Sequence, residues 1–189
     1  MGLIRAQQVC KEYQVGEVAV QALKDIHFEI EPASFVSFVG PSGSGKTTLL
    51  NLIGCLDKPT SGTLTVAGTD VSSLDRASGA AFRGRTIGFI FQDFNLLPVL
   101  TVYENIEYPL LMVQKIPPGE RSRRVIELLS AVGMADQKEK MPDQISGGQK
   151  QRVAIARALV TQPKLVLADE PPANLDHDTA YRVLNLMKR

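Results

Sequence analysis

An eight-residue glycine-rich segment, Gly40 to Thr47 (GPSGSGKT), constrains this chain more than any other part of its sequence. It matches G-x-x-x-x-G-K-[ST] at every required position. The short apolar run before it, Ser34 to Val39, predicts a buried strand, and Lys46 to Cys55 after it predicts a helix. A strand, a tight turn and a helix in this order form a phosphate-binding loop, because backbone N–H groups and the helix N-terminus point at phosphate oxygens.

The residue types of this loop suit a nucleoside triphosphate. Lys46 supplies a positive charge to the β and γ phosphates, Thr47 places its hydroxyl on Mg²⁺, and Thr48 is a further phosphate contact. A glycine-rich turn with a chance lysine is the alternative, and it does not explain the flanking elements. The expected nucleotide-binding residues of this segment are Gly40, Pro41, Ser42, Gly43, Ser44, Gly45, Lys46, Thr47 and Thr48.

A second apolar run, Lys164 to Glu170 (KLVLADE), ends in two adjacent carboxylates. Two acids at the end of a buried strand are costly unless a cation binds there. In a parallel sheet this strand can lie beside the phosphate loop, so we expect Asp169 to hold Mg²⁺ and Glu170 to orient and deprotonate the attacking water. An acidic helix cap or turn is the alternative, and it explains one carboxylate better than two.

A third segment, Ile145 to Gln149 (ISGGQ), predicts a second phosphate-binding helix start. Ser146 is placed as the N-cap, and the two glycines that follow allow close backbone access. A single chain does not need two phosphate-binding helix starts to bind one triphosphate. We therefore expect a head-to-tail homodimer in which each copy closes on the nucleotide of the other through Ser146, Gly147, Gly148 and Gln149.

These three motifs in this order resemble those of the ATPases of ABC transporters, with Walker A at 40–47, the signature motif at 145–149 and Walker B at 165–170. The resemblance implies ATP and Mg²⁺ as cofactors. It also implies that Gln92 is the Q-loop glutamine that senses Mg²⁺ and the attacking water, that Tyr13 stacks on adenine, and that Asp176 is the D-loop aspartate. The expected catalytic residues are then Glu170, Gln92 and Lys46, and the expected metal ligands are Thr47, Gln92 and Asp169. The alternative for Tyr13 is that it is only an aromatic residue on a strand face.

A narrower resemblance, to the lipoprotein-release and macrolide-export group of ABC ATPases, lies in the segments LLNLIGCLDKPTSG, FIFQDFNLLP, TVYENIEYPL and QRVAIARALV. It implies an integral membrane permease as partner, and a cytoplasmic protein held through that permease on the inner face of the cell membrane. Phe94, Leu96, Leu97 and Tyr103 are expected to form an apolar cleft for a permease helix. The alternative is that these side chains only pack the helical part on the core.

Two features differ from the family pattern. The family carries a switch histidine a few tens of residues beyond Walker B, and this chain ends nineteen positions after Glu170, so we expect a C-terminally truncated cassette. Pro172-Ala173 also replaces the Thr-Gly that usually precedes Asn-Leu-Asp, which restricts the D-loop backbone. A second hypothesis follows, a degenerate cassette that binds nucleotide or a partner without efficient hydrolysis.

The expected fold is α/β, a P-loop NTPase (RecA-like) core with an antiparallel β subdomain and an inserted α-helical subdomain. Ile26, Phe28 and Ile30 alternate with polar residues, which predicts a strand, and Val125, Leu128, Leu129 and Val132 recur at helical spacing. We place the nucleotide-binding core and β subdomain in residues 1–91 and 161–189, and the helical signature subdomain in 92–160.

Composition narrows the class of partners. The 189 residues carry a net charge of +1, so nucleic acid is not an expected partner, and no apolar stretch is long enough to span a membrane. Cys10 and Cys55 have no metal-ligand spacing and are expected to be small core residues. We expect His27 and His177 to be surface residues.

Overall fold

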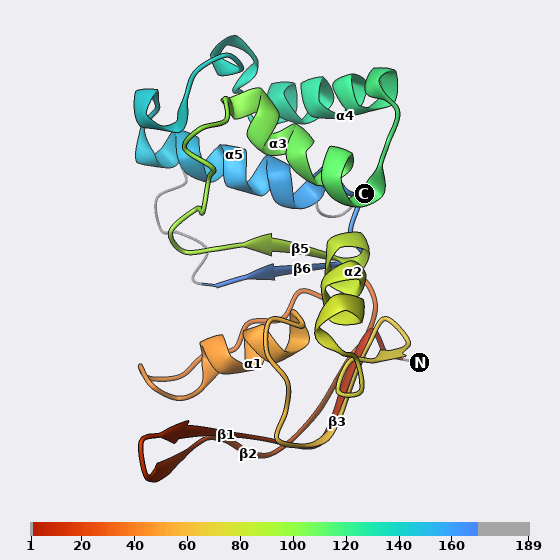
Figure 1. Cartoon of the computed structure of the whole chain (residues 1–189), viewed down its shortest axis with the longest axis vertical. Helices are drawn as coiled ribbons and strands as arrows, with labels where there is room; N and C mark the ends of the chain where they lie inside the picture. The colour runs from red at the N-terminus through yellow and green to blue at the C-terminus, as the bar shows by residue number, and fades with distance from the viewer. Residues whose placement is uncertain (1, 170–189) are drawn as a thin grey trace. The chain divides into compact units, whose positions relative to one another are not determined.

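The computed structural model of the chain describes residues 2–169, and the chain divides into two compact units, Met1–Arg83 and Gly84–Arg189. The first unit contains β1 (Ile4–Val15), β2 (Val18–Ile30), α1 (Lys46–Ile53), β3 (Ser61–Val66) and β4 (Thr69–Asp70), and α2 (Arg76–Thr86) crosses the boundary (Figure 1). The second unit contains β5 (Ile87–Ile90), α3 (Val102–Pro109), α4 (Pro118–Ala131), α5 (Gly147–Leu159) and β6 (Leu165–Ala168). Its short helical turns are η1 (Leu110–Gln114), η2 (Ala135–Gln137) and η3 (Pro142–Gln144).

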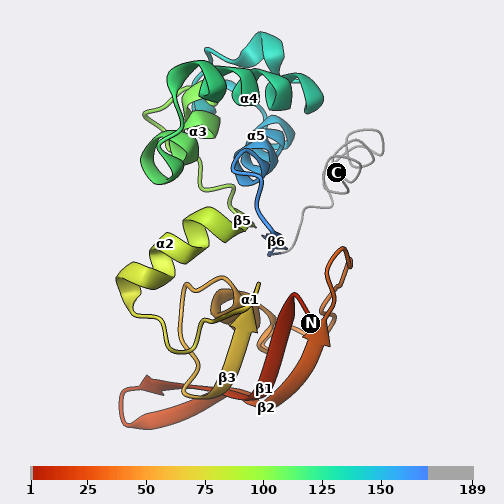
Figure 2. The ribbon, with the colours of Figure 1, turned by 90° about the vertical axis from the view of Figure 1, so that its right-hand side faces the viewer.

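The first unit is built on a four-stranded antiparallel sheet in the order β2-β1-β3-β4 (Figure 2). Leu64 and Val66 of β3 are fully buried, and Ile4 of β1 pairs with Val66 in the register. On β2 the alternation of half-buried and exposed residues from Asp25 to Ile30 confirms the predicted strand. His27 is exposed, as expected, and is bonded to Asp25.

Helix α1 begins at Lys46, as the sequence predicted, and ends at Ile53, two residues before the expected end. Gly54 follows it, and its N–H donates to the carbonyl of Leu50. The helix buries Leu49, Leu52 and Ile53. Both cysteines of the chain are free and half-buried, which agrees in part with the expectation that they are core residues.

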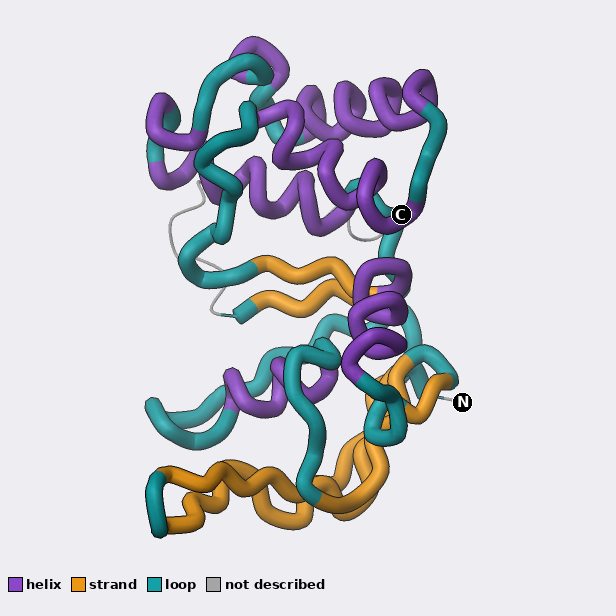
Figure 3. The backbone as a smooth tube through the Cα atoms, viewed as in Figure 1, coloured by secondary structure: helices purple, strands orange, loops and turns teal. Residues whose placement is uncertain are grey.

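The prediction of a buried strand at Ser34 to Val39 is wrong for this structure. The segment carries no strand assignment, and Figure 3 draws the chain between β2 and α1 as loop. Phe35 is 81% exposed and Val39 93% exposed. A buried strand needs hydrogen-bonded neighbours to satisfy its backbone. Within residues 2–169 neither of the two sheets includes this segment, so the apolar run lacks the ladder that would bury it.

The second unit combines a parallel pair of strands with a helical core. β5 pairs with β6 in the register Ile87↔Leu165 to Ile90↔Ala168, which confirms the predicted strand at 165–168. Helices α3, α4 and α5 lie together (Figure 1) and bury one apolar cluster. The helical stripe predicted from the sequence supplies part of it, since Val125, Leu129 and Val132 are buried. Val153 and Ala156 of α5, and Val160 directly after it, are buried in the same cluster. The predicted domain boundaries at 91–92 and 160–161 stay predictions.

None of the helices between residues 2 and 169 combines the length and the apolar content that a bilayer crossing requires.

Candidate functional site

The phosphate loop of the first unit has a backbone that requires glycine. Gly43 and Gly45 have φ of 79° and 88°, in the region that side-chain-bearing residues rarely adopt. A Cβ at Gly45 would lie 2.7 Å from the carbonyl oxygen of Ala22, and one at Gly40 would lie 2.8 Å from Oγ of Ser44. Pro41 accepts from the N–H of Ser44 at 3.2 Å, which closes the turn. This backbone forms the tight, glycine-dependent turn that a phosphate-binding loop requires.

The lysine of the loop already contacts the loop's own backbone. Lys46 Nζ donates to the carbonyl of Gly40 at 2.8 Å and to that of Pro41 at 2.9 Å. No side chain caps α1, since its N-cap residue is Gly45. The start of α1 and the Lys46 ammonium thus belong to one loop, which is the arrangement a triphosphate requires. Thr47 and Thr48 are the second and third residues of α1 and lie in its first turn.

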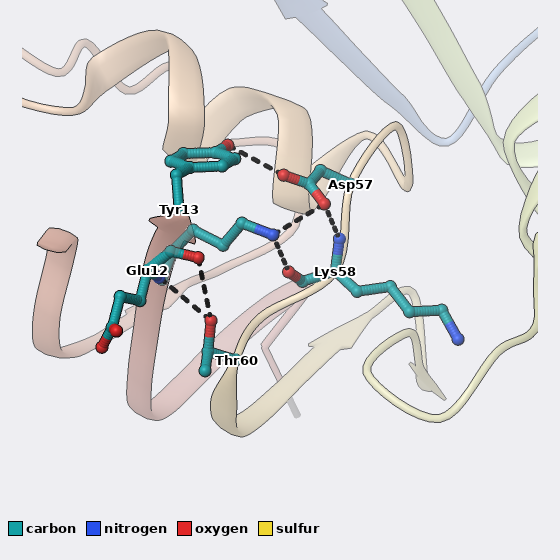
Figure 4. Close-up of polar contacts among 6 residues, drawn as sticks. Glu12, Tyr13, Asp57, Lys58 and Thr60 are labelled. Atoms are coloured by element: carbon teal, nitrogen blue, oxygen red, sulfur yellow. Dashed lines mark hydrogen bonds and ion pairs between the residues drawn. The ribbon is translucent and has the colours of Figure 1, made fainter. Parts of the chain in front are cut away.

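Tyr13 lies on β1, and its hydroxyl donates to Asp57 Oδ2 at 2.8 Å (Figure 4). Burial raises the pKa of Tyr13, the hydrogen bond to Asp57 raises it further, and a side-chain hydrogen bond to Thr48 acts in the opposite direction. Tyr13 and Thr48 are therefore brought together in the first unit. This contact joins the expected base-stacking ring to the helix that follows the phosphate loop.

In the second unit, Gln92 and Asp169 follow the carboxyl ends of two paired parallel strands. Ile90 of β5 is opposite Ala168 of β6, and the N–H of Asp169 donates to the carbonyl of Ile90 at 3.1 Å. Ligands bind at this edge of parallel sheets. Both residues make further polar contacts, so neither is unpartnered. An amide and a carboxylate at one sheet edge offer the oxygen ligands that Mg²⁺ prefers.

Ser146 is the N-cap of α5, as predicted. Its Oγ accepts from the N–H of Gln149 at 3.3 Å, and its own N–H donates to Gln149 Oε1 at 2.8 Å, so the two residues form a reciprocal capping box. Among the described residues, 2–169, a Cβ at Gly147 would meet no atom within 4 Å. The helix start is therefore capped by its own side chains, and no described side chain covers Gly147.

Two residues that the sequence analysis did not single out fix the segment after Gln92. Asn105 is 1% exposed; its Oδ1 accepts from the N–H of Leu97, and its Nδ2 donates to the carbonyls of Leu97, Leu100 and Thr101. Arg157 of α5 donates to the carbonyls of Phe94 at 2.7 Å and Asn95 at 2.6 Å. Phe94 and Asn95 both have positive φ, 59° and 47°, which for a bulky residue is a strained conformation. In the sequence, Asn105 and Arg157 are polar residues within otherwise apolar helical segments, and this pattern is the signal that could have identified them.

Replacing Arg157 by Met should lower the free energy of unfolding by about 1.5–3 kcal/mol, the usual effect of hydrogen bonds to a charged group. Met keeps the apolar stem but leaves the carbonyls of Phe94 and Asn95 without their donors. Urea denaturation measures the change in the free energy of unfolding, with the m-value (its dependence on urea concentration) the same in both proteins. Arg123→Met is the control, because its ion pair with Glu127 is exposed and its loss should change the stability by no more than roughly 0.5 kcal/mol. Equal losses in the two variants would contradict a structural role for Arg157.

The four expected docking residues differ in exposure. Leu96 and Tyr103 are partly buried and pack against the helical core, which favours the packing alternative for them, and Phe94 is half-buried. Leu97 remains 38% exposed and Val99, two residues on, is more exposed still. Glu170 and Asp176 lie outside the described residues, as do Pro172-Ala173 and His177.

Comparisons with known proteins agree with this architecture. Residues 23–173 match the family model for ABC transporters. The chain is 49% identical to an ABC transporter ATP-binding protein of Thermotoga maritima, over 96% of this chain and 77% of that protein. It is 46% identical to the macrolide export ATP-binding/permease protein MacB of Syntrophobacter fumaroxidans, over 100% of this chain and 27% of that protein.

The fold is also found among solved structures. The dimeric cassette MJ0796 of Methanocaldococcus jannaschii, in a post-hydrolysis state bound to ADP and Pi, superposes with a TM-score of 0.90 at 42% identity, over 97% of this chain and 81% of that one. The family match over most of the chain and the structural likeness support the same family membership. The chain belongs to the ABC transporter family, as an ATPase cassette with the P-loop NTPase fold.

Proposed function

We propose that two copies of this chain bind Mg²⁺-ATP head to tail and hydrolyse it to drive a membrane permease. The observation that carries the proposal is the presence of two helix starts suited to phosphate. Helix α1 begins without a side-chain cap behind the glycine loop, and α5 begins at the Ser146 capping box with open space at Gly147. A head-to-tail pair uses both on each nucleotide.

Each expected site residue then has a distinct role. Lys46 and the loop N–H groups hold the β and γ phosphates, and Thr47 and Asp169 supply oxygen ligands for Mg²⁺. Gln92 and Asp169 follow two paired strands that end at the same sheet edge. Glu170 deprotonates the attacking water, and Asp176 couples the two sites of the dimer. The donor set suits Mg²⁺, because hydroxyl, amide and carboxylate oxygens are its preferred ligands.

We propose a transporter of the macrolide-export or lipoprotein-release type. Support comes from the identity to MacB, whose name joins an ATP-binding part to a permease. The apolar side chains that remain exposed around the segment after Gln92 and on η1 suit a permease contact. They are Leu97, Val99, Leu111 and Met112. The alternative, a cassette that binds nucleotide without turnover, is disfavoured by the likeness to a protein trapped after hydrolysis.

A pair of substitutions at Ser146 tests the head-to-tail arrangement. Asp and Asn are both as good as Ser at an N-cap, so the start of α5 should persist in Ser146→Asp and Ser146→Asn. Only Asp places a negative charge opposite the partner's γ phosphate. With a non-hydrolysable ATP analogue and Mg²⁺, sedimentation velocity should show dimers for the wild type and Ser146→Asn, and at least about tenfold weaker dimerisation for Ser146→Asp.

Circular dichroism of the free chains controls for folding, and binding of the analogue to the monomer should be the same in both variants. Equal dimerisation of the Asp and Asn variants would exclude a phosphate contact by Ser146. Absence of nucleotide-dependent dimers in the wild type would refute the arrangement as a whole.

A further inference from the structure

The carboxylate of Asp57 connects strand β1 to the segment that follows α1. It accepts from the Tyr13 hydroxyl at 2.8 Å, from Lys11 Nζ at 2.8 Å and from the backbone N–H of Lys58 at 2.7 Å (Figure 4). Lys11 Nζ also donates to the carbonyl of Lys58 at 2.8 Å. We call Lys11, Tyr13 and Asp57 the tyrosine clamp.

Within this clamp the tyrosine ring is held in two ways. The hydrogen bond to Asp57 fixes its hydroxyl, and Lys11 Nζ lies 4.7 Å from the ring centroid, within the range of a cation–π contact. Lys11 and Tyr13 both lie on β1, and their side chains reach the same carboxylate, that of Asp57. The ring therefore has a cation over one face and a fixed edge.

Asp57 itself is held by the end of the helix that follows the phosphate loop. The N–H groups of Leu56 and Asp57 both donate to the carbonyl of Asn51 in α1, at 2.9 and 3.3 Å. Burial raises the pKa of Asp57, but hydrogen bonds from Lys11 and Tyr13 outweigh it and the pKa is lowered. The carboxylate is thus ionised at neutral pH. It ties the ring on β1 to α1, whose other end begins at Lys46.

We propose that Asp57 and Lys11 are positioning residues for the nucleobase, which fix the Tyr13 ring so that a purine stacks on the face opposite Lys11. The inference rests on the proposed function, because it requires Tyr13 to contact the base. Because the Tyr13 ring is already fixed, it loses less side-chain freedom when a base binds. The Lys11 ammonium covers one face of the ring, so the base stacks on the other face. The clamp therefore contributes to the affinity for the base and not to the grip on the phosphates.

The test compares a ligand that has a base with one that lacks it. Calorimetry would measure the dissociation constants of Mg²⁺-ATP and Mg²⁺-tripolyphosphate for Asp57→Asn, Lys11→Met and the wild type. We expect each variant to bind ATP about three- to tenfold more weakly, because Lys11→Met loses a cation–π contact and Asp57→Asn loses a charged hydrogen bond. The binding of tripolyphosphate should be unchanged in both variants. Glu12→Gln is the matched control, since it makes the same carboxylate-to-amide change on a side chain that points away from the ring (Figure 4).

Tyr13→Ala separates this inference from the role of Tyr13 itself. If Tyr13→Ala weakens ATP binding while Asp57→Asn and Lys11→Met do not, the clamp is overturned and the base contact stands. If Tyr13→Ala has no effect on ATP binding, both fail. Equal weakening of ATP and tripolyphosphate binding in the clamp variants would show a general loss of structure and would also overturn the inference.

Discussion

Glu170→Gln is expected to reduce steady-state ATP hydrolysis by about 10²–10⁴-fold, the range that loss of a general base produces. Gln has nearly the same size and cannot accept the proton of the attacking water. ATP binding should remain, because the phosphate contacts proposed above come from the Gly40–Thr47 loop. The bound dimer should then accumulate in the presence of Mg²⁺-ATP, since hydrolysis no longer lets the two copies separate. Phosphate release and sedimentation of the same samples measure both effects.

Glu139→Gln provides the comparison for this change. Its carboxylate is 80% exposed on the second unit, so the turnover of this variant should equal that of the wild type. Unchanged turnover in Glu170→Gln would refute the base assignment. A wild-type chain that binds ATP and shows no hydrolysis would favour the alternative of a cassette without turnover.

The sequence predicted well those elements whose structure depends only on residues within the element itself. The stripe Val125, Leu129, Val132 needs only helical periodicity, and Ser146 needs only a free hydroxyl three residues before Gln149. The strand expected at Ser34 to Val39 depends on neighbours in a sheet. An apolar run shows that a segment is suited to burial, but the hydrogen-bonded partners decide whether it is buried.

The same distinction applies to the site. Motif spacing identifies the loop lysine and the N-cap serine, because their chemistry is local. Asp57 and Arg157 were missed, since each acts on a segment far along the chain: Asp57 on Tyr13, and Arg157 on Phe94 and Asn95. A charge next to an apolar stripe signals such a role, but its partner becomes visible only in three dimensions.

Lys46→Met should weaken the binding of Mg²⁺-ATP by about 10- to 100-fold, as expected for loss of a charged contact to phosphate. In the structure the ammonium lies between the carbonyls of Gly40 and Pro41, so it is already placed inside the loop before an anion arrives. AMP has neither the β nor the γ phosphate, and its affinity should therefore change little. Lys24→Met removes a lysine from an exposed position on β2 and should leave the binding of both nucleotides unchanged. Equal weakening of ATP and AMP binding in Lys46→Met would show that the substitution collapses the loop, and it would contradict a specific contact with the terminal phosphates.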